Sequence, residues 1–145
     1  MANVIPKAFK TELLSGTHNF ANGGDSFKLA LYTAGSGVPY DENATAFASN
    51  VANQVSSSGT NYPAGGETLL GQAVAISSST GTVDFADRTF ASVTLTARYG
   101  VIYNDTNSDK LCLVLDFGGN KTATNGDFVV QFPTANASDA IIRIA

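Results

Sequence analysis

The sequence predicts an all-β protein, an antiparallel β-sandwich of jelly-roll type with a short N-terminal helix. Val, Thr, Phe and Gly are abundant, and branched and aromatic side chains fit a pleated surface better than a helix. Strand patterns recur at intervals of about 8 to 14 residues with clusters of turn residues between them, which is typical of an antiparallel sandwich. The 145 residues fit a single domain, residues 1–145.

Helical spacing occurs at the start of the chain, where residues 1–16 are expected to form an arm and a helix. Apolar side chains recur at four-residue steps within Ile5–Leu14. Pro6 could occupy the first helical turn and Gly16 could end the helix. We therefore expect one short helix over Ile5–Leu14.

The first strand is expected at Ser26–Thr33, where side chains alternate in character. The large apolar residues from Phe27 to Leu31 would share one face, and the alternate residues from Lys28 to Tyr32 would share the other. This alternation is typical of a half-buried strand.

A long segment, Ala34–Gly66, is expected to be mostly loop because it has few large apolar residues, with one short helical turn around Thr45–Asn53. Tyr62 before Pro63 is held extended. Three glycines permit a positive φ or a close backbone approach: Gly59, Gly65 and Gly66. We expect an ordered structural loop here, and a ligand-binding loop is the alternative.

Strand signals resume after this loop and bring the expected number of strands to seven. The later segments are Leu69–Ile76, Gly81–Phe85, Ser92–Asn104, Lys110–Phe117, Asp127–Phe132 and Ala140–Ile144. Turn formers at Asp105–Asp109 predict a hairpin between the third and fourth of these segments. A second hairpin is expected through Gly118–Gly126.

Composition narrows the possible partners. Only 14% of residues are charged, and eight Lys and Arg against twelve Asp and Glu give a net charge of −4. Phosphate-backbone affinity comes from Lys and Arg, so we expect no nucleic acid partner. Apolar runs are too short to span a membrane, and Met1–Lys10 has no apolar signal core, so we expect synthesis in the cytoplasm.

Histidine and cysteine, which often serve as base and nucleophile in enzymes, occur once each. His18 is expected to be an exposed loop residue just after the helix. Cys112 is expected to be a small buried or half-buried hydrophobe on the face of its strand opposite Leu111, Leu113 and Leu115. A single cysteine excludes an internal disulfide.

Five carboxylates gather in the second half of the chain: Asp84, Asp87, Asp105, Asp109 and Asp116. The first two suit a strand end with a local ion pair to Arg88, and Asp105 and Asp109 suit a turn. Asp105–Asp116 partly matches a calcium loop, but Lys110 stands where glycine is required, so a hairpin is favoured. We expect no catalytic, cofactor-binding or metal-binding residue.

Several motifs run from end to end of the chain: LLSG at Leu13–Gly16, FKLALYT at Phe27–Thr33, the glycine and tyrosine pattern of Asn53–Leu69, Val83–Thr106, and Leu113–Pro133. Together they resemble a family of small tailed-bacteriophage virion structural proteins. Phe90 stands where the family commonly has tryptophan, and Asn19–Gly24 replaces a more acidic loop.

The resemblance implies a non-enzymatic component of the virion. We expect a capsid decoration (cement) protein that binds the major capsid protein or other virion proteins and forms a homo-oligomer, a dimer or trimer. Met1–Pro6 and Ala34–Gly66 are the expected contact segments.

Two other classes stay open. A tail or baseplate module, structural or sugar-binding, could use exposed tyrosines to stack on sugar rings. An enzyme would need paired acids such as Asp84 and Asp87 in a cleft. The tyrosine candidates are Tyr32, Tyr40, Tyr62, Tyr99 and Tyr103.

Overall fold

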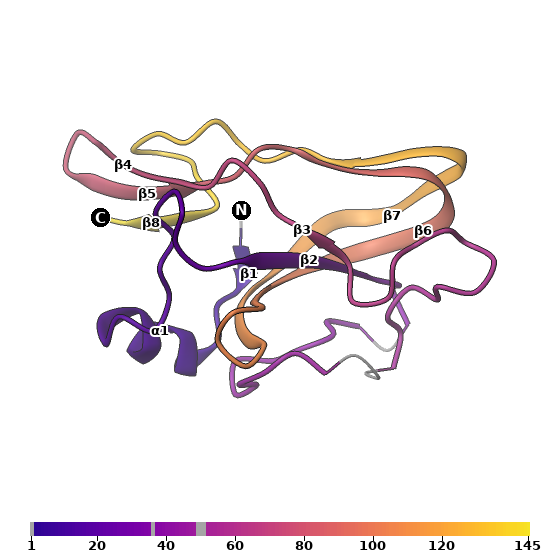
Figure 1. Ribbon diagram of the computed structural model, residues 1–145, viewed down its shortest axis with the longest axis horizontal. Coiled ribbons are helices and arrows are strands. Elements are labelled where there is room, and N and C mark those ends of the chain that lie inside the picture. Colours follow the sequence, from indigo (N-terminus) through magenta and orange to yellow (C-terminus); the bar gives the residue numbers. More distant parts are fainter. Residues whose placement is uncertain (1, 36, 49–51) are drawn as a thin grey trace.

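The computed structural model describes residues 2–35, 37–48 and 52–145. It contains two antiparallel sheets and one short helix, which confirms the predicted all-β sandwich (Figure 1). The large sheet has the strand order β1, β7, β6, β2, β3, and the small sheet has the order β4, β5, β8. The elements are β1 (Ala2–Val4), α1 (Lys7–Leu14), β2 (Phe27–Tyr32), β3 (Glu67–Thr68), β4 (Ala73–Ser77), β5 (Thr80–Asp84), β6 (Arg88–Asn104), β7 (Lys110–Val130) and β8 (Ile142–Ile144).

The predicted helix is present as α1, with Pro6 at its N-cap and Gly16 at a φ of 77° just beyond its end. The arm before it is a strand, β1, that pairs with β7 in the same chain. No helix in the described part of the chain is long and apolar enough to cross a membrane.

A long two-stranded ribbon, β6 with β7, dominates the fold. The predicted hairpin is confirmed, because Asn104 pairs with Lys110 across the turn. The second predicted hairpin, through Gly118–Gly126, is wrong: this segment lies inside β7 and continues to pair with β6. Figure 1 shows the ribbon curling back over the large sheet at the right-hand end of the molecule.

Bulges explain this curl. Between the pairs Tyr99↔Asp116 and Ala97↔Lys121, β6 contributes one residue and β7 contributes four. Gly118, at a φ of 81°, lies in this excess, and further register shifts follow along the ribbon. Such extra residues bend a strand and increase its twist. The far half of the ribbon therefore folds over and closes the main core.

The main core lies between the layers. Phe90 and Phe128 from the far half of the ribbon belong to the same buried cluster as Leu29 and Leu115 of the large sheet. Val83, on β5, joins this cluster from the small sheet. Burial of these side chains supplies the main favourable term in folding.

The prediction that Ser26–Thr33 is half-buried is wrong, because β2 is buried on both faces. A second cluster covers the face that carries Ala30 and Tyr32. Part of its cover comes from the long loop: the ring of Phe47 stacks on Tyr103 with a centroid distance of 4.0 Å, and Tyr40 meets Tyr32 edge to face.

The helical turn expected around Thr45–Asn53 does not occur in the described part of that segment, and residues 49–51 lie outside it. In its place, single bridges join Ala46 to Lys110 and Gln54 to Tyr32. These bridges and the aromatic contacts hold the loop against the large sheet.

The predicted strand Leu69–Ile76 is present only from Ala73 onward, as β4, and the two-residue strand β3 lies just before the predicted segment. Gly71, at a φ of 66°, separates β3 from β4, so the chain leaves the large sheet and enters the small one. The backbone of Gly71 lies close to Ala86, because a Cβ added at Gly71 would lie 3.0 Å from the methyl carbon of Ala86. The predicted strands Lys110–Phe117 and Asp127–Phe132 are parts of one continuous strand, β7, and the other predicted strands are present with shifted ends.

Candidate functional site

The prediction that His18 is exposed is wrong: its side chain is fully buried behind α1. Nε2 lies 2.9 Å from Oε2 of Glu12, and Nδ1 lies 3.0 Å from Nδ2 of Asn104. Lys110 donates to the other Glu12 oxygen at 3.1 Å. We call Glu12, His18, Asp25, Asn104 and Lys110 the polar cluster.

Asn104 fixes how the protons are arranged in the polar cluster. Its Oδ1 accepts hydrogen bonds from the backbone N–H groups of Thr106 and Asn107, so Nδ2 must face His18 and Asp25. Because Nδ2 is a donor only, His18 Nδ1 accepts and its proton sits on Nε2, directed at Glu12.

The Glu12 carboxylate is the charged centre of the polar cluster. Burial raises its pKa, but the hydrogen bonds from His18 and Lys110 outweigh burial and hold the pKa below its ordinary value of 4.5. The cluster therefore links α1 to the hairpin between β6 and β7 and is most stable with Glu12 ionised.

In space, His18 lies between Cys112 and Glu12, as the base lies between nucleophile and acid in a catalytic triad. The contacts between these three side chains are nevertheless packing contacts. Sγ lies 3.9 Å from His18 Nδ1, whose lone pair Asn104 already occupies. Cys112 is fully buried, and burial raises the pKa of its thiol well above the ordinary value. The expected small buried hydrophobe is confirmed.

The prediction that Cys112 lies on the strand face opposite Leu111, Leu113 and Leu115 is wrong in detail. Cys112 is the extra residue of a bulge. Ile102 pairs with Leu113 and Tyr103 pairs with Leu111, so Cys112 has no partner in the register. Leu111 consequently joins the second cluster, while Leu113 joins the main core together with Cys112.

The carboxylates predicted from the sequence have structural partners, beginning with the two that precede β6. Asp84 accepts the backbone N–H of Phe85, and Asp87 accepts that of Phe132. Arg88 pairs with Glu67 at 2.7 Å, so the local ion pair expected with Asp84 or Asp87 is wrong.

The other carboxylates also have structural partners. Asp116 binds Arg98 through both oxygens at 3.2 Å, and these hydrogen bonds lower its pKa. Asp105 and Asp109 lie in the hairpin turn, as predicted. Within the described ranges, no group of three or more His, Cys, Asp or Glu side chains is placed to hold a metal ion.

The five tyrosines proposed as sugar-stacking residues are all buried, none more than 8% exposed. Tyr62 shows their role: its hydroxyl accepts the backbone N–H of Leu31, and burial raises its pKa to about 12. Tyr103 donates to the carbonyl of Gly65 at 2.6 Å. These tyrosines anchor the glycine-rich loop to the large sheet, which agrees with the expected ordered structural loop.

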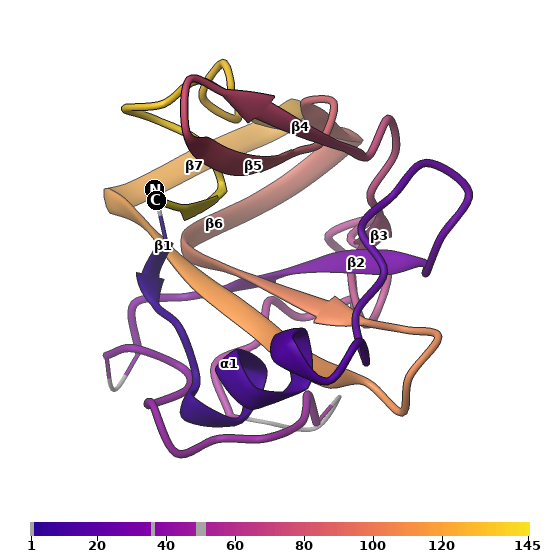
Figure 2. The same cartoon turned by 90° about the vertical axis from the view of Figure 1, so that its left-hand side faces the viewer.

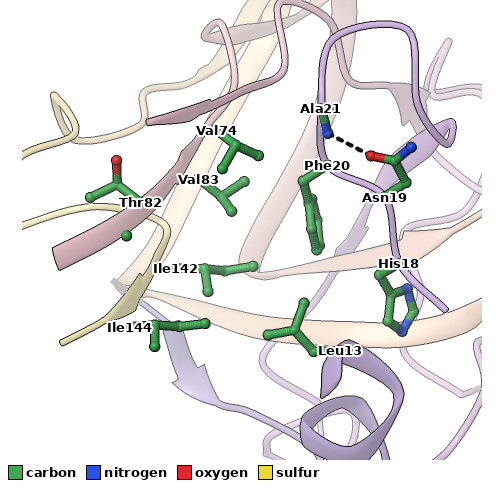
Figure 3. A pocket seen from close by; sticks show the side chains of 11 residues that line it. Leu13, His18, Asn19, Phe20, Ala21, Val74, Thr82, Val83, Ile142 and Ile144 are labelled. Carbon is green, nitrogen blue, oxygen red and sulfur yellow. Dashed lines mark hydrogen bonds between the residues drawn. The ribbon is translucent and has the colours of Figure 1, made fainter. Parts of the chain in front are cut away.

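An apolar groove of about 380 Å³ lies at the end of the molecule where α1 approaches the small sheet. Figure 3 shows Leu13, Phe20, Val74 and Ile142 pointing into the space between the small sheet and the segment after α1. Gly81 adds no side chain to the middle strand, which leaves the groove open beside Ile144.

A second hollow, of about 290 Å³, adjoins this groove and shares its central side chains. Leu14 is 88% exposed, Ile144 58% and Val74 57%. Figure 2 faces this end of the molecule and shows the small sheet above α1. We call Leu13, Leu14, Val74, Ile142 and Ile144 the apolar face.

Large apolar side chains exposed together on neighbouring elements mark interaction sites in proteins. The apolar face therefore suits docking to another macromolecule. Sequence reasoning missed it, since it expected contacts through Met1–Pro6 and Ala34–Gly66. One signal was present: Thr68–Val83 contains no charged residue.

No protein-family model, curated protein or solved structure matches this chain. The resemblance to virion structural proteins is therefore an expectation from the sequence motifs alone.

Proposed function

We propose that this chain is a non-catalytic virion structural protein, a capsid decoration protein that binds the shell through the apolar face. The observation that carries the proposal is the exposure of Leu14 on α1 together with Val74 and Ile144 on the two outer strands of the small sheet. Full burial of a side chain of this size contributes about 1.5–3 kcal/mol. Repeated contacts over a shell would add up such modest energies.

The arrangement of reactive groups supports binding over catalysis. His18 and Cys112 are buried together, and their hydrogen-bonding groups are committed to the polar cluster and its neighbours. Asp84 accepts the backbone N–H of Phe85, just before β6, and Asp87 accepts that of Phe132, just after β7. These contacts favour a docking module over a reaction centre. The partner that we propose for it is the major capsid protein or another virion protein.

The experiment is co-sedimentation of the purified chain with virions from which it has been removed. We predict that Leu14→Lys weakens binding by about tenfold or more, because the exposed leucine is lost from the apolar face. Lysine at the end of a helix is compatible with the helix dipole, so α1 should persist.

The matched control is Val129→Lys, at a β7 residue that is 49% exposed and lies outside both the apolar face and the expected contact segments. It should bind as the unmodified chain does. Equal binding by Leu14→Lys would refute docking through the apolar face, and failure of the unmodified chain to bind any part of the virion would refute the proposed function.

A further inference from the structure

The small sheet ends in a strand whose outer edge is open. β4 lies at the edge of that sheet, next to β5 only (Figure 1). Its residues Ala73 to Ile76 are all exposed. Edge strands in monomeric proteins usually carry charges, proline or a cover that prevents pairing. The β4 sequence, AVAIS, has neither charge nor proline.

The hairpin register shows which backbone groups face outward. Ser77 pairs with Thr80 across a two-residue turn, so Ser77, Ala75 and Ala73 direct their N–H and C=O groups toward β5. The alternate residues, Val74 and Ile76, direct theirs away from the sheet. The open edge thus offers two donors and two acceptors in one line.

We propose that two copies of this chain pair through β4 in antiparallel register, related by a two-fold axis at Ala75. In this register Val74 of each copy lies opposite Ile76 of the other, and both pairs exchange two backbone hydrogen bonds. Other two-fold registers would use the turn residue Ser78 or the residue before β4, so this register satisfies the most outward groups within the strand.

Side-chain chemistry is self-complementary in the same register. Val74 meets Ile76 on one face at both ends of the seam, while Ala75 meets its own copy at the centre on the other face. Each copy carries a net charge of −4, but the uncharged stretch Thr68–Val83 keeps like charges away from the seam. A second copy therefore fits this edge better than a charged peptide would.

The size of the seam sets the strength of the dimer. Five residues span about 17 Å, so the buried surface falls below the roughly 800 Å² per partner of a standard interface. The dimer is therefore reversible and concentration-dependent in solution. Because opposite residues in an antiparallel pair share a face, both copies direct the apolar face to the same side.

The first test is disulfide trapping, which reads the register directly. With Ala75→Cys, the two thiols face each other in a pair whose Cα atoms lie about 4.5 Å apart, within disulfide range. With Ser77→Cys, the two thiols are four strand positions apart, about 13 Å. Under mild oxidation we expect a covalent dimer from Ala75→Cys alone, and native Cys112 stays buried in both variants.

The second test is sedimentation equilibrium of the unmodified chain over a range of concentrations. The mass should rise from 15.0 kDa toward twice that value, Ala75→Lys should remain at 15.0 kDa, and Val129→Lys should behave as the unmodified chain. A folded chain that stays monomeric at every concentration, or equal trapping by Ser77→Cys, overturns the proposal. Neither test involves virions, so the outcome is independent of the proposed function.

Discussion

Asn104 makes more connections than any other side chain of the polar cluster. It is fully buried and joins His18 and Asp25 to the backbone of the hairpin turn. Truncation would leave these donors and acceptors without partners in a site with little water, and such losses are costly.

We predict that Asn104→Ala lowers the free energy of unfolding by about 2–4 kcal/mol. Urea unfolding followed by circular dichroism measures the change. The control is Asn120→Ala, because Asn120 is exposed in the bulge of β7 and should change stability by less than about 0.5 kcal/mol. Equal effects from the two variants would show that the polar cluster is not structural.

Glu12 gives the polar cluster a pH dependence with a defined sign. Its pKa in the folded chain lies below the ordinary value of 4.5, so ionised Glu12 favours the folded state. This stabilisation is complete above 4.5 and is lost as the pH falls through the folded-state pKa.

We predict that Glu12→Gln is less stable than the unmodified chain at pH 7, and that the difference shrinks steadily below pH 4.5. Urea unfolding at a series of pH values measures both chains. A difference that stays constant or grows in acid would contradict the assignment of Glu12 as the stabilising carboxylate.

For single residues, the sequence predicted the burial of Cys112 correctly and the exposure of His18 incorrectly. A cysteine between leucines in a strand pattern is buried whatever its partners are. His18 is buried only because Asn104, 86 residues away, and Glu12 satisfy its two nitrogens. No spacing within the local sequence shows that these residues meet.

Among the elements, the glycine-rich loop before β3 depends on one close approach. A Cβ at Gly66 would overlap the backbone carbonyl of Leu29, and its φ is 87°. Gly59, in the same loop, has a similar φ of 72° but open space around it. Substituting each of the two glycines in turn therefore distinguishes the cost of a steric clash from the cost of backbone strain.

We predict that Gly66→Ala destabilises the fold by more than about 4 kcal/mol, because β2 must move away from β3. Gly59→Ala should cost only about 1–2 kcal/mol, the cost of a left-handed conformation with a side chain. Thermal and urea unfolding measure both variants. Equal costs would mean that the loop does not press against β2.

The helix α1, the strand β2 and the hairpin at residues 105–109 could be predicted because each is encoded by neighbouring residues. The segment Gly118–Gly126 could not, since glycine and asparagine favour a turn and a bulge alike. What decides between them is whether β6 is long enough to pair with both halves of β7. That is a property of the pair of strands.

The cover over the second face of β2 was also missed. Tyr40 and Phe47 are single aromatic residues among small and polar ones, so neither shows a strand or helix period. Their burial depends on the hydrogen bonds that hold the loop, such as Phe47 N–H to the carbonyl of Asp109.

For the whole molecule, the sandwich was predictable because strand spacing and turn residues recur along the entire chain. The apolar face was not, because Leu14 and Ile144 lie at opposite ends of the sequence and meet only after folding. The proposed dimer would place two apolar faces on one side, which suits bivalent attachment to repeated subunits.

The most direct test of the central claim is the copy number of this chain in purified virions, measured by quantitative mass spectrometry against the major capsid protein. We predict a fixed ratio to the major capsid protein, as expected for a component repeated over the shell. Only a few copies per virion would place the chain in the tail, and its absence from virions would contradict the account altogether.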